Sequence, residues 1–126
     1  MMPFTASCGI EMEEASSKSV RGRMAWAPER CTVEGVLHGG ALMTLADSVG
    51  AICAFLNLPE GATTATVESK TNFFRAVRSG SVVATAQPLH VGRTLITVQT
   101  AIRDDHDQLV AQTTQTQAVL AAASKE

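Results

Sequence analysis

The chain has 126 residues, which suits a single domain with a hydrophobic core and is too short for two. Apolar residues make up 45% of it and charged residues 17%, as in an ordinary globular protein. The net charge is −2 and the ten basic residues are scattered, which argues against nucleic acid as a partner.

The three cysteines, Cys8, Cys31 and Cys53, are an odd number and form no C-x-x-C pair. This pattern favours a reducing compartment over a disulfide framework or a zinc site, so we expect a cytoplasmic protein with no metal. The first four residues lack the basic and apolar runs of a signal peptide. No apolar run reaches membrane-spanning length, so we expect no membrane partner.

The first third of the chain predicts two strands and a loop. Residues 1–9 leave a short helical turn and a loose arm both open. Strands are expected at residues 10–15 and 20–26, the second because apolar and polar side chains alternate there. Pro28 ends that strand, and residues 29–37 are expected to form an irregular loop.

A long helix is predicted from Gly39 to Asn57. Small and apolar residues surround it on all sides, which predicts burial on nearly every face. Asp47 is its single charge, and an unpaired buried charge is costly, so Asp47 needs a structural or a chemical reason. The apolar residues that recur at helical spacing are Leu42, Leu45, Val49, Ile52 and Leu56.

The remainder is rich in Thr, Val, Ile and Gln and predicts strands at 63–74, 81–90, 94–103 and 109–120. Their short connections imply antiparallel pairing. We therefore expect an α+β fold, residues 1–126 forming one domain in which a six-stranded antiparallel sheet wraps around one long central helix. Such a sheet leaves an open edge and part of the helix under-covered, which predicts oligomerisation.

Two motifs lie at the start of the helix: residues 35–40 read G-V-L-H-G-G, and residues 45–48 read L-A-D-S. On these motifs, and on residues 66–75 and 88–93, the chain resembles the hotdog-fold acyl-CoA thioesterases of the PaaI-like group, in the 4-hydroxybenzoyl-CoA thioesterase superfamily. The resemblance runs from about residue 10 to residue 120. It implies a hotdog fold and hydrolysis of an acyl-CoA or aryl-CoA thioester to free acid and CoA. It implies no cofactor, since CoA is part of the substrate.

Thioester hydrolysis needs a donor for the carbonyl oxygen as charge builds on it, and a carboxylate that activates water or attacks directly. Asp47 suits the second role, as general base or nucleophile. The backbone N–H groups of Gly39 and Gly40 open the helix and suit the first role. His38 would position the thioester or shape the loop.

His38 and Asp47 are nine residues apart, roughly 180° around a helix and about 13 Å along it. Groups so placed cannot flank one scissile bond within one chain. If both act on one thioester, they must come from different subunits. The resemblance agrees, because it implies active sites across a two-fold interface, in a homodimer expected to assemble into a tetramer.

The resemblance assigns further roles. Thr66 would hold the attacking water, and Ser48 would assist the carboxylate. Thr32 stands where the family usually has Asn or Gln, and Phe73 where the aryl-specific branch often has His. The turn at 88–93 looks most like that aryl branch. Candidates for binding the substrate and its coenzyme portion, through side-chain contact, backbone approach or phosphate contact, are Gly40, Phe73, Arg75, Arg78, Gly92 and Arg93.

Two alternatives stay open beside thioester hydrolysis. A hotdog hydratase or dehydratase would need a His and an acidic residue at short spacing, which this sequence lacks. A non-catalytic acyl-CoA-binding dimer is favoured by Thr32. The identity of the acyl group, and CoA against an acyl-carrier protein, also stay open. We expect the acidic segment 104–107 to be a solvated turn rather than a metal site, and Cys53 to be inert packing.

Overall fold

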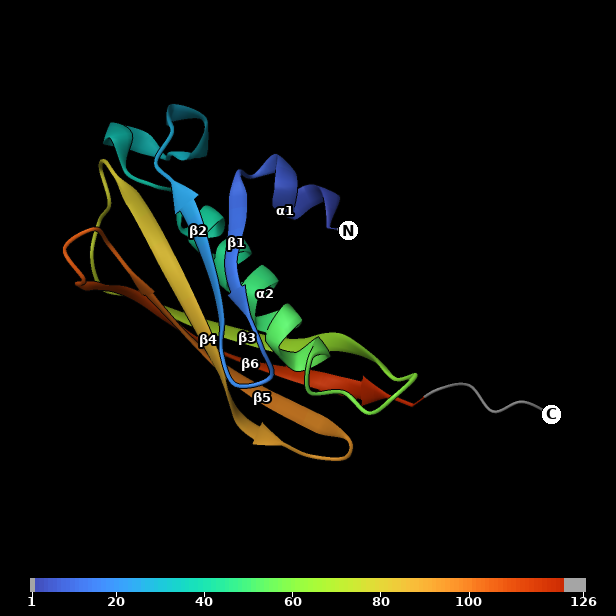
Figure 1. The fold of residues 1–126 in the computed structure, drawn as a ribbon. Helices are drawn as coiled ribbons and strands as arrows, with labels where there is room; N and C mark the ends of the chain where they lie inside the picture. The colour runs from blue at the N-terminus through green and yellow to red at the C-terminus, as the bar shows by residue number, and fades with distance from the viewer. Residues whose placement is uncertain (1, 122–126) are drawn as a thin grey trace.

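The computed structural model describes residues 2–121, so Met1 and residues 122–126 of the expected domain lie outside the described residues. A six-stranded antiparallel sheet curves around one long helix (Figure 1). The elements are α1 (Pro3–Ser7), β1 (Ile10–Ala15), β2 (Val20–Ala25), the 3₁₀ turns η1 (Pro28–Arg30) and η2 (Val33–Gly35), α2 (Gly39–Phe55), β3 (Thr63–Phe73), β4 (Ser81–Val91), β5 (Leu95–Arg103) and β6 (Leu109–Leu120).

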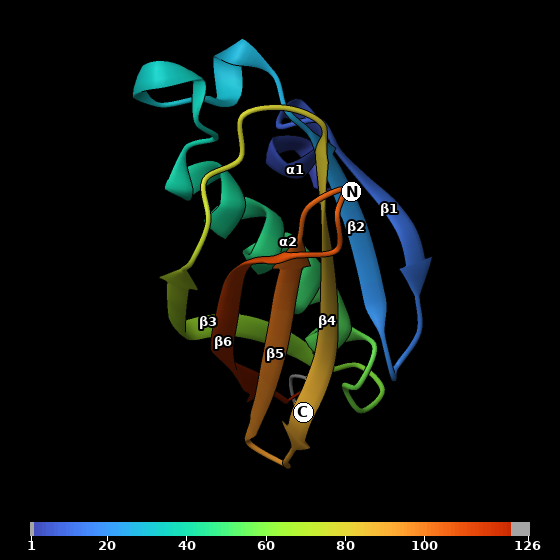
Figure 2. The same cartoon turned by 90° about the vertical axis from the view of Figure 1, so that its left-hand side faces the viewer.

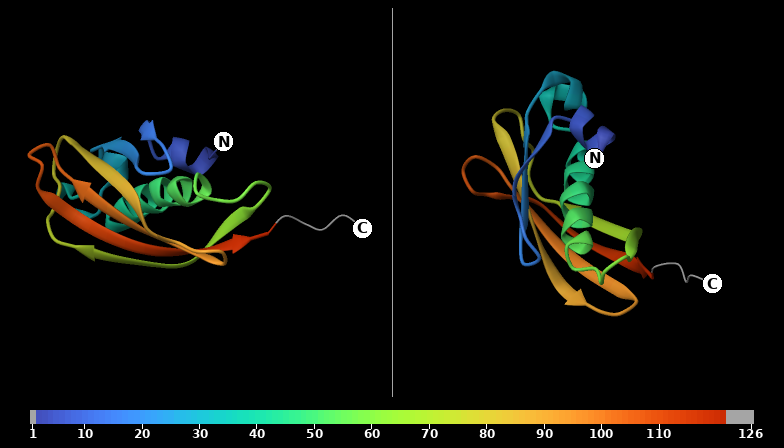
Figure 3. Two further views of the ribbon diagram at one scale, coloured as in Figure 1. Left: turned by 60° about the horizontal axis from the view of Figure 1, so that its bottom comes forward. Right: turned by 45° about the vertical axis from the view of Figure 1, so that its right-hand side comes forward.

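The strands lie in the order β1-β2-β4-β5-β6-β3, as Figure 2 shows, and every neighbouring pair is antiparallel. Helix α2 lies along the concave side of this sheet (Figure 3). The predicted α+β fold, with one sheet wrapped around one helix, is therefore confirmed. No helix in the described part of the chain has the length and apolarity needed to cross a membrane.

The core lies between α2 and the sheet. Leu45 and Val49 of α2 are fully buried against strand residues such as Met24 and Ile102. The expected burial of α2 on nearly every face is wrong, however, because Met43 and other residues of the side away from the sheet are exposed. A single sheet covers only one side of a helix, so in one chain the opposite side faces solvent.

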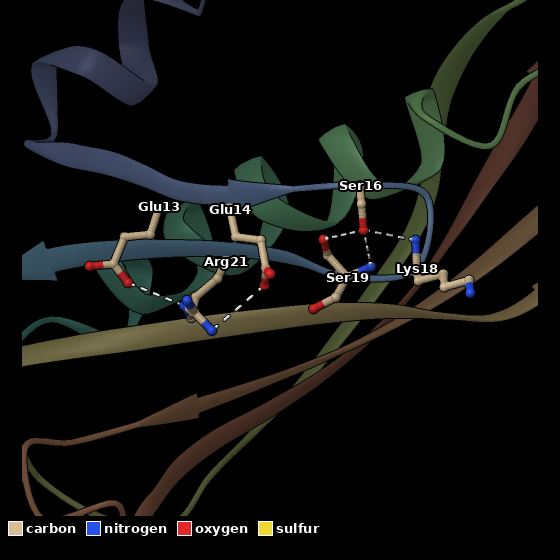
Figure 4. Close-up of polar contacts among 6 residues, drawn as sticks. All are labelled: Glu13, Glu14, Ser16, Lys18, Ser19 and Arg21. Carbon is tan, nitrogen blue, oxygen red and sulfur yellow. Dashed lines mark hydrogen bonds and ion pairs between the residues drawn. The ribbon is translucent and has the colours of Figure 1, made fainter.

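The two edge strands differ in how they are protected. On β1 and β2, Arg21 binds Glu13 at 3.3 Å and Glu14 at 3.6 Å, and Ser16 caps the turn between the strands (Figure 4). Charged side chains and a bulge between Met12 and Glu14 make β1 a poor template for further pairing.

Strand β3 is the other edge; it carries Glu68, Lys70 and a register shift between Thr66 and Glu68, but it forms no ion pair among the described residues. It pairs only with β6, and none of its residues is buried. Val67 and Phe73 are 60% and 49% exposed. The predicted open edge is therefore confirmed, and it lies at β3.

Two irregularities decide which side chains lie under α2. On β6, Arg103 pairs with Leu109 and Ile102 with Ala111, so Val110 is an extra residue in the ladder. On β3, the register shifts between Thr66 and Glu68. A bulge of one residue reverses the faces of all residues beyond it. After the β6 bulge the buried, inward-facing residues are Ala111, Thr113, Gln115 and Gln117.

Candidate active site

The first half of the site is the start of α2. His38 is the N-cap, and its Nδ1 accepts a hydrogen bond from the Gly40 N–H at 2.7 Å. Since Nδ1 accepts, a neutral imidazole carries its proton on Nε2 and can donate it outward. The exposed His38 ring therefore combines a capping role with a free donor.

The two glycines are not equivalent. The Gly40 N–H is occupied by His38, which corrects the prediction that both glycine N–H groups are free donors. The Gly39 N–H has no hydrogen-bond partner among residues 2–121. Phe73 lies over Gly39, because a Cβ added at Gly39 would stand 3.2 Å from the ring Cζ. The free N–H thus opens beside an aromatic ring at the positive end of the helix.

The loop before α2 is fixed by backbone hydrogen bonds. The Leu37 N–H donates to the Val77 carbonyl, and the His38 N–H donates to the Arg30 carbonyl, both at 2.9 Å. Thr32 is exposed in this loop and lines a cavity of about 370 Å³ together with Gly39, Phe73 and Arg75. The structure therefore brings the predicted Thr32 to the helix start.

The second half of the site is Asp47, which is exposed on the open side of α2. Its Oδ1 accepts from Thr66 Oγ1 at 3.4 Å and from Gln115 Nε2 at 3.3 Å. Its Oδ2 makes no hydrogen bond to the described residues. Thr66 thus lies beside the carboxylate, where the resemblance implies that it should, and Gln115 is a partner that our sequence interpretation missed.

Ser48 lies beside Asp47 in sequence but takes part in another contact. It is buried, and its Oγ is 2.8 Å from Thr5 Oγ1. This hydrogen bond attaches α1 to α2. Ser48 is therefore buried under α1, and it lines the same cavity as Asp47.

Within one chain the two halves line separate cavities. Asp47 lines a cavity of about 510 Å³ with Phe4 and Met43, whereas His38 and Gly40 line another of about 400 Å³. From Gly39 to Asp47 the helix advances about 12 Å. One chain therefore presents two half-sites that cannot act on the same bond.

The predicted phosphate-binding residues fall into two groups. Arg75 and Arg78 are exposed before β4, near the start of α2, whereas Gly92 and Arg93 follow β4 at its other end. The eleven residues of β4 separate the groups by roughly 35 Å. They cannot meet the phosphates of one coenzyme within one chain, and only Arg75 shares a cavity with Gly39.

The surroundings of two other titratable groups, Asp104 and Cys53, indicate structural roles. Asp104 accepts from the His106 and Gln108 backbone N–H groups at 2.9 Å, and these bonds, the Gln108 bond foremost, lower the pKa of its carboxyl. Burial raises the pKa of the Cys53 thiol, as befits a core residue. Residues 2–121 contain no cluster of three or more His, Cys, Asp or Glu that could hold a metal ion.

Several known proteins are similar to this chain in sequence and in fold. A solved thioesterase structure from Haemophilus influenzae has a TM-score of 0.91 at 29% identity, over 98% of this chain and 86% of that one. A provisionally named esterase from Mycobacterium tuberculosis is 33% identical over 113 residues, 87% of this chain and 81% of that protein. Its solved structure has a TM-score of 0.91. The proofreading thioesterase EntH of Cronobacter sakazakii is 39% identical over 59 residues, 47% of this chain and 43% of that protein.

The fold and the likenesses together define a hotdog-fold thioester hydrolase. The model of the thioesterase superfamily matches residues 34–111, which include His38, Gly39 and Asp47. The chain therefore belongs to the thioesterase superfamily.

Proposed function

We propose that the protein hydrolyses acyl-CoA or aryl-CoA thioesters to free acid and CoA, at a site built from two copies of the chain. The observation that carries the proposal is the geometry of Asp47. Its carboxylate is held through Oδ1 beside an apolar cavity, and its Oδ2 is free of contacts within the described residues. A carboxylate oxygen so placed can take a proton from water or attack a carbonyl carbon.

The roles follow from the contacts. In the general-base form, Oδ2 takes a proton from water as the water oxygen bonds to the thioester carbon. The carbonyl oxygen then gains negative charge, which the Gly39 N–H of the second copy stabilises. His38 orients the thioester through Nε2–H, and Thr66 holds the water near Asp47. The C–S bond breaks, and CoA leaves as a thiolate that is then protonated.

The open edge at β3 supports the proposal of a second copy. Thr66 lies on this edge strand, so a copy that adds its own β3 there would come close to the Asp47 half-site. A two-fold axis would run the two α2 helices in opposite directions, which brings the start of each toward the Asp47 of the other. We therefore propose a homodimer. Assembly into a tetramer stays a prediction.

The substrate class rests on the two cavities. Phe4 and Met43 supply apolar walls beside Asp47, suited to an acyl chain or an aryl ring. Arg75 lies beside Gly39 and suits the coenzyme phosphates. The reaction as written uses only the substrate, water and these side chains, so we propose no cofactor besides the CoA of the substrate. A cytoplasmic location also stays a prediction.

The test is free-thiol release from a panel of acyl-CoA and aryl-CoA substrates, with Asp47→Asn as the variant. Asparagine keeps the shape of the side chain but cannot act as a base, so we expect kcat to fall at least about 100-fold. Glu60→Gln is the matched control, because it neutralises an exposed carboxylate between α2 and β3 that makes no hydrogen bond to a described side chain and lies outside the cavities beside Asp47 and Gly39. Its kcat should match that of the unmodified protein.

Three results would contradict the proposal. The first is undiminished turnover by Asp47→Asn. The second is hydration of an enoyl-CoA without release of thiol, which would indicate a hydratase. The third is tight acyl-CoA binding with no thiol released over hours, which would indicate a binding protein.

A further inference from the structure

Two glutamines of β6 lie buried beneath α2, where apolar side chains usually pack. Gln115 is 0% exposed and Gln117 1%. A buried amide lowers stability unless its polar atoms are hydrogen-bonded. The question is therefore what these two amides bind.

Only one of the two polar atoms of the Gln115 amide makes a hydrogen bond to the described residues. Its Nε2 donates to Asp47 Oδ1 at 3.3 Å, whereas its Oε1 is buried and has no hydrogen-bond partner among the described residues. A methionine of similar shape would leave no such orphan oxygen. Gln115 is therefore a poor choice for stability alone.

Gly50 makes room for this amide. It lies in the middle of α2, where glycine lowers helix stability relative to alanine. A Cβ added at Gly50 would overlap the Gln115 Oε1 atom. The glycine therefore lowers the helix propensity of α2 at the point where the Gln115 amide lies beneath it.

Gln117 fixes the second donor to Asp47. Its Nε2 donates to Thr66 Oγ1 at 2.7 Å, and its Oε1 accepts from Thr64 Oγ1 at 3.0 Å. Because the Thr66 hydroxyl accepts from Gln117, its own proton is left to point toward Asp47. The hydrogen bonds therefore run from Gln117 through Thr66 to the carboxylate, whereas the single Thr64 hydroxyl proton is shared between Gln117 Oε1 and the Ala118 carbonyl, each at 3.0 Å.

We propose that Gln115 and Gln117 are positioning residues for the hydrolysis. Gln115 directly, and Gln117 through Thr66, direct two donors to the same Asp47 oxygen, Oδ1. This fixes the rotation of the carboxylate and leaves Oδ2 facing the substrate. The inference rests on the proposed role of Asp47.

Gln115→Met is the primary test. It removes the donor and the unpaired oxygen together while keeping the volume of the side chain. We expect kcat to fall roughly tenfold with KM unchanged, because the buried amide does not contact the substrate. The thermal midpoint should stay the same or rise, which a merely structural role would not produce.

Thr100→Val is the matched control. Thr100 is 0% exposed, and its Oγ1 is also buried without a partner among the described residues, but it makes no contact with Asp47. The variant should respond in stability as Gln115→Met does and keep its kcat. An equal loss of kcat in both variants would indicate general repacking of the core and overturn the inference.

The Asp47→Asn background separates this inference from the proposed function. If Gln115 acts through the carboxylate, Gln115→Met should not lower the residual rate of Asp47→Asn further. Full activity of Asp47→Asn would overturn the proposed function itself. An inactive Asp47→Asn together with a fully active Gln115→Met would overturn only the positioning role.

Gln117→Met keeps the inference falsifiable if Gln115→Met does not fold. It leaves the Gln115 donor in place but frees the Thr66 hydroxyl to rotate. We expect a smaller loss of kcat than for Gln115→Met, severalfold, again with KM unchanged. Unchanged kcat per folded molecule in this variant would overturn the inference.

Discussion

The proposed oxyanion donor, the Gly39 N–H, belongs to the backbone, so an ordinary side-chain substitution cannot remove it. Gly39 is the first residue of α2, and its N–H has no partner among the described residues. The first helical position tolerates proline, which lacks this N–H. His38 has φ −64° and ψ 136°, a conformation that the residue before a proline readily adopts.

Gly39→Pro is therefore expected to remove the oxyanion donor while keeping the helix start. Loss of one such donor lowers kcat by about 100- to 1,000-fold. Gly39→Ala is the control, since it also places a Cβ against the Phe73 ring but retains the N–H. Steady-state kinetics and thermal unfolding of both variants check the prediction, and equal kcat values for the two would rule out the Gly39 N–H as the donor.

At the scale of the element, the small size of Gly50 in α2 fits the side chain that lies beneath it. This mid-helix glycine has a neighbour, Gln115, whose Oε1 would overlap an added Cβ. The effect of a substitution at Gly50 should therefore depend on residue 115. Helix propensity alone would predict the opposite sign.

Gly50→Ala in the unmodified protein should lower the free energy of unfolding by about 1–3 kcal/mol, because the new methyl group displaces the buried amide. In a Gln115→Ala background the clash is gone, and the same change should raise it by up to about 1 kcal/mol through helix propensity. Urea unfolding of the four proteins measures the coupling. A Gly50→Ala effect that is the same in both backgrounds would refute the close approach of the two residues.

The elements themselves could be predicted closely because their periodicity is local. Strands β1 and β6 begin and end at the predicted residues, and α2 ends at Phe55 where Asn57 was expected. Asp47 and the glycines were found because a charge or a glycine pair on an apolar helix is visible in the sequence. The role proposed for these residues can be inferred without knowing how the sheet is arranged.

Gln115 and Gln117 could not be found in the same way. Counted from Val110, strict alternation would place residues 112, 114 and 116 inward and both glutamines outward. The extra residue at Val110 reverses that pattern. A bulge depends on how β5 and β6 pair, which the sequence of β6 does not contain.

The sequence predicted that part of α2 would be under-covered, but not that Asp47 would lie on the exposed part. How much of a helix one sheet covers is set by the curvature of six strands and not by the helix sequence. The small residues of α2 favour close packing on every side, but one chain supplies the packing on one side only. The anomaly that drew attention to Asp47, a charge expected to be buried, is therefore absent from the single chain, in which Asp47 is exposed.

At the scale of the whole molecule, the proposed division of the site into two half-sites predicts how a mixture of two inactive variants behaves. Asp47→Asn and Gly39→Pro damage opposite halves, so each homodimer is expected to be inactive. In a mixed dimer both lesions fall in one site, and the other site is intact. With random exchange half of the dimers are mixed, so the mixture should recover about a quarter of the unmodified activity.

This recovery can be measured by thiol release after the two variants are mixed and given time to exchange subunits. A mixture of Asp47→Asn with Glu60→Gln is the control, and it should keep about half of the unmodified activity whether or not subunits exchange. No recovery, with exchange demonstrated by mass spectrometry of differently labelled subunits, would contradict a site shared between two chains.

The open edge at β3 has a consequence for how much activity a given amount of protein yields. If pairing along β3 completes the site, only associated chains are catalytic. At concentrations well below the dissociation constant of the dimer, the number of pairs grows with the square of the number of chains. Halving the protein concentration would then reduce the total rate of hydrolysis to a quarter. The rate of thioester hydrolysis would therefore change more than proportionally when the expression of the gene changes.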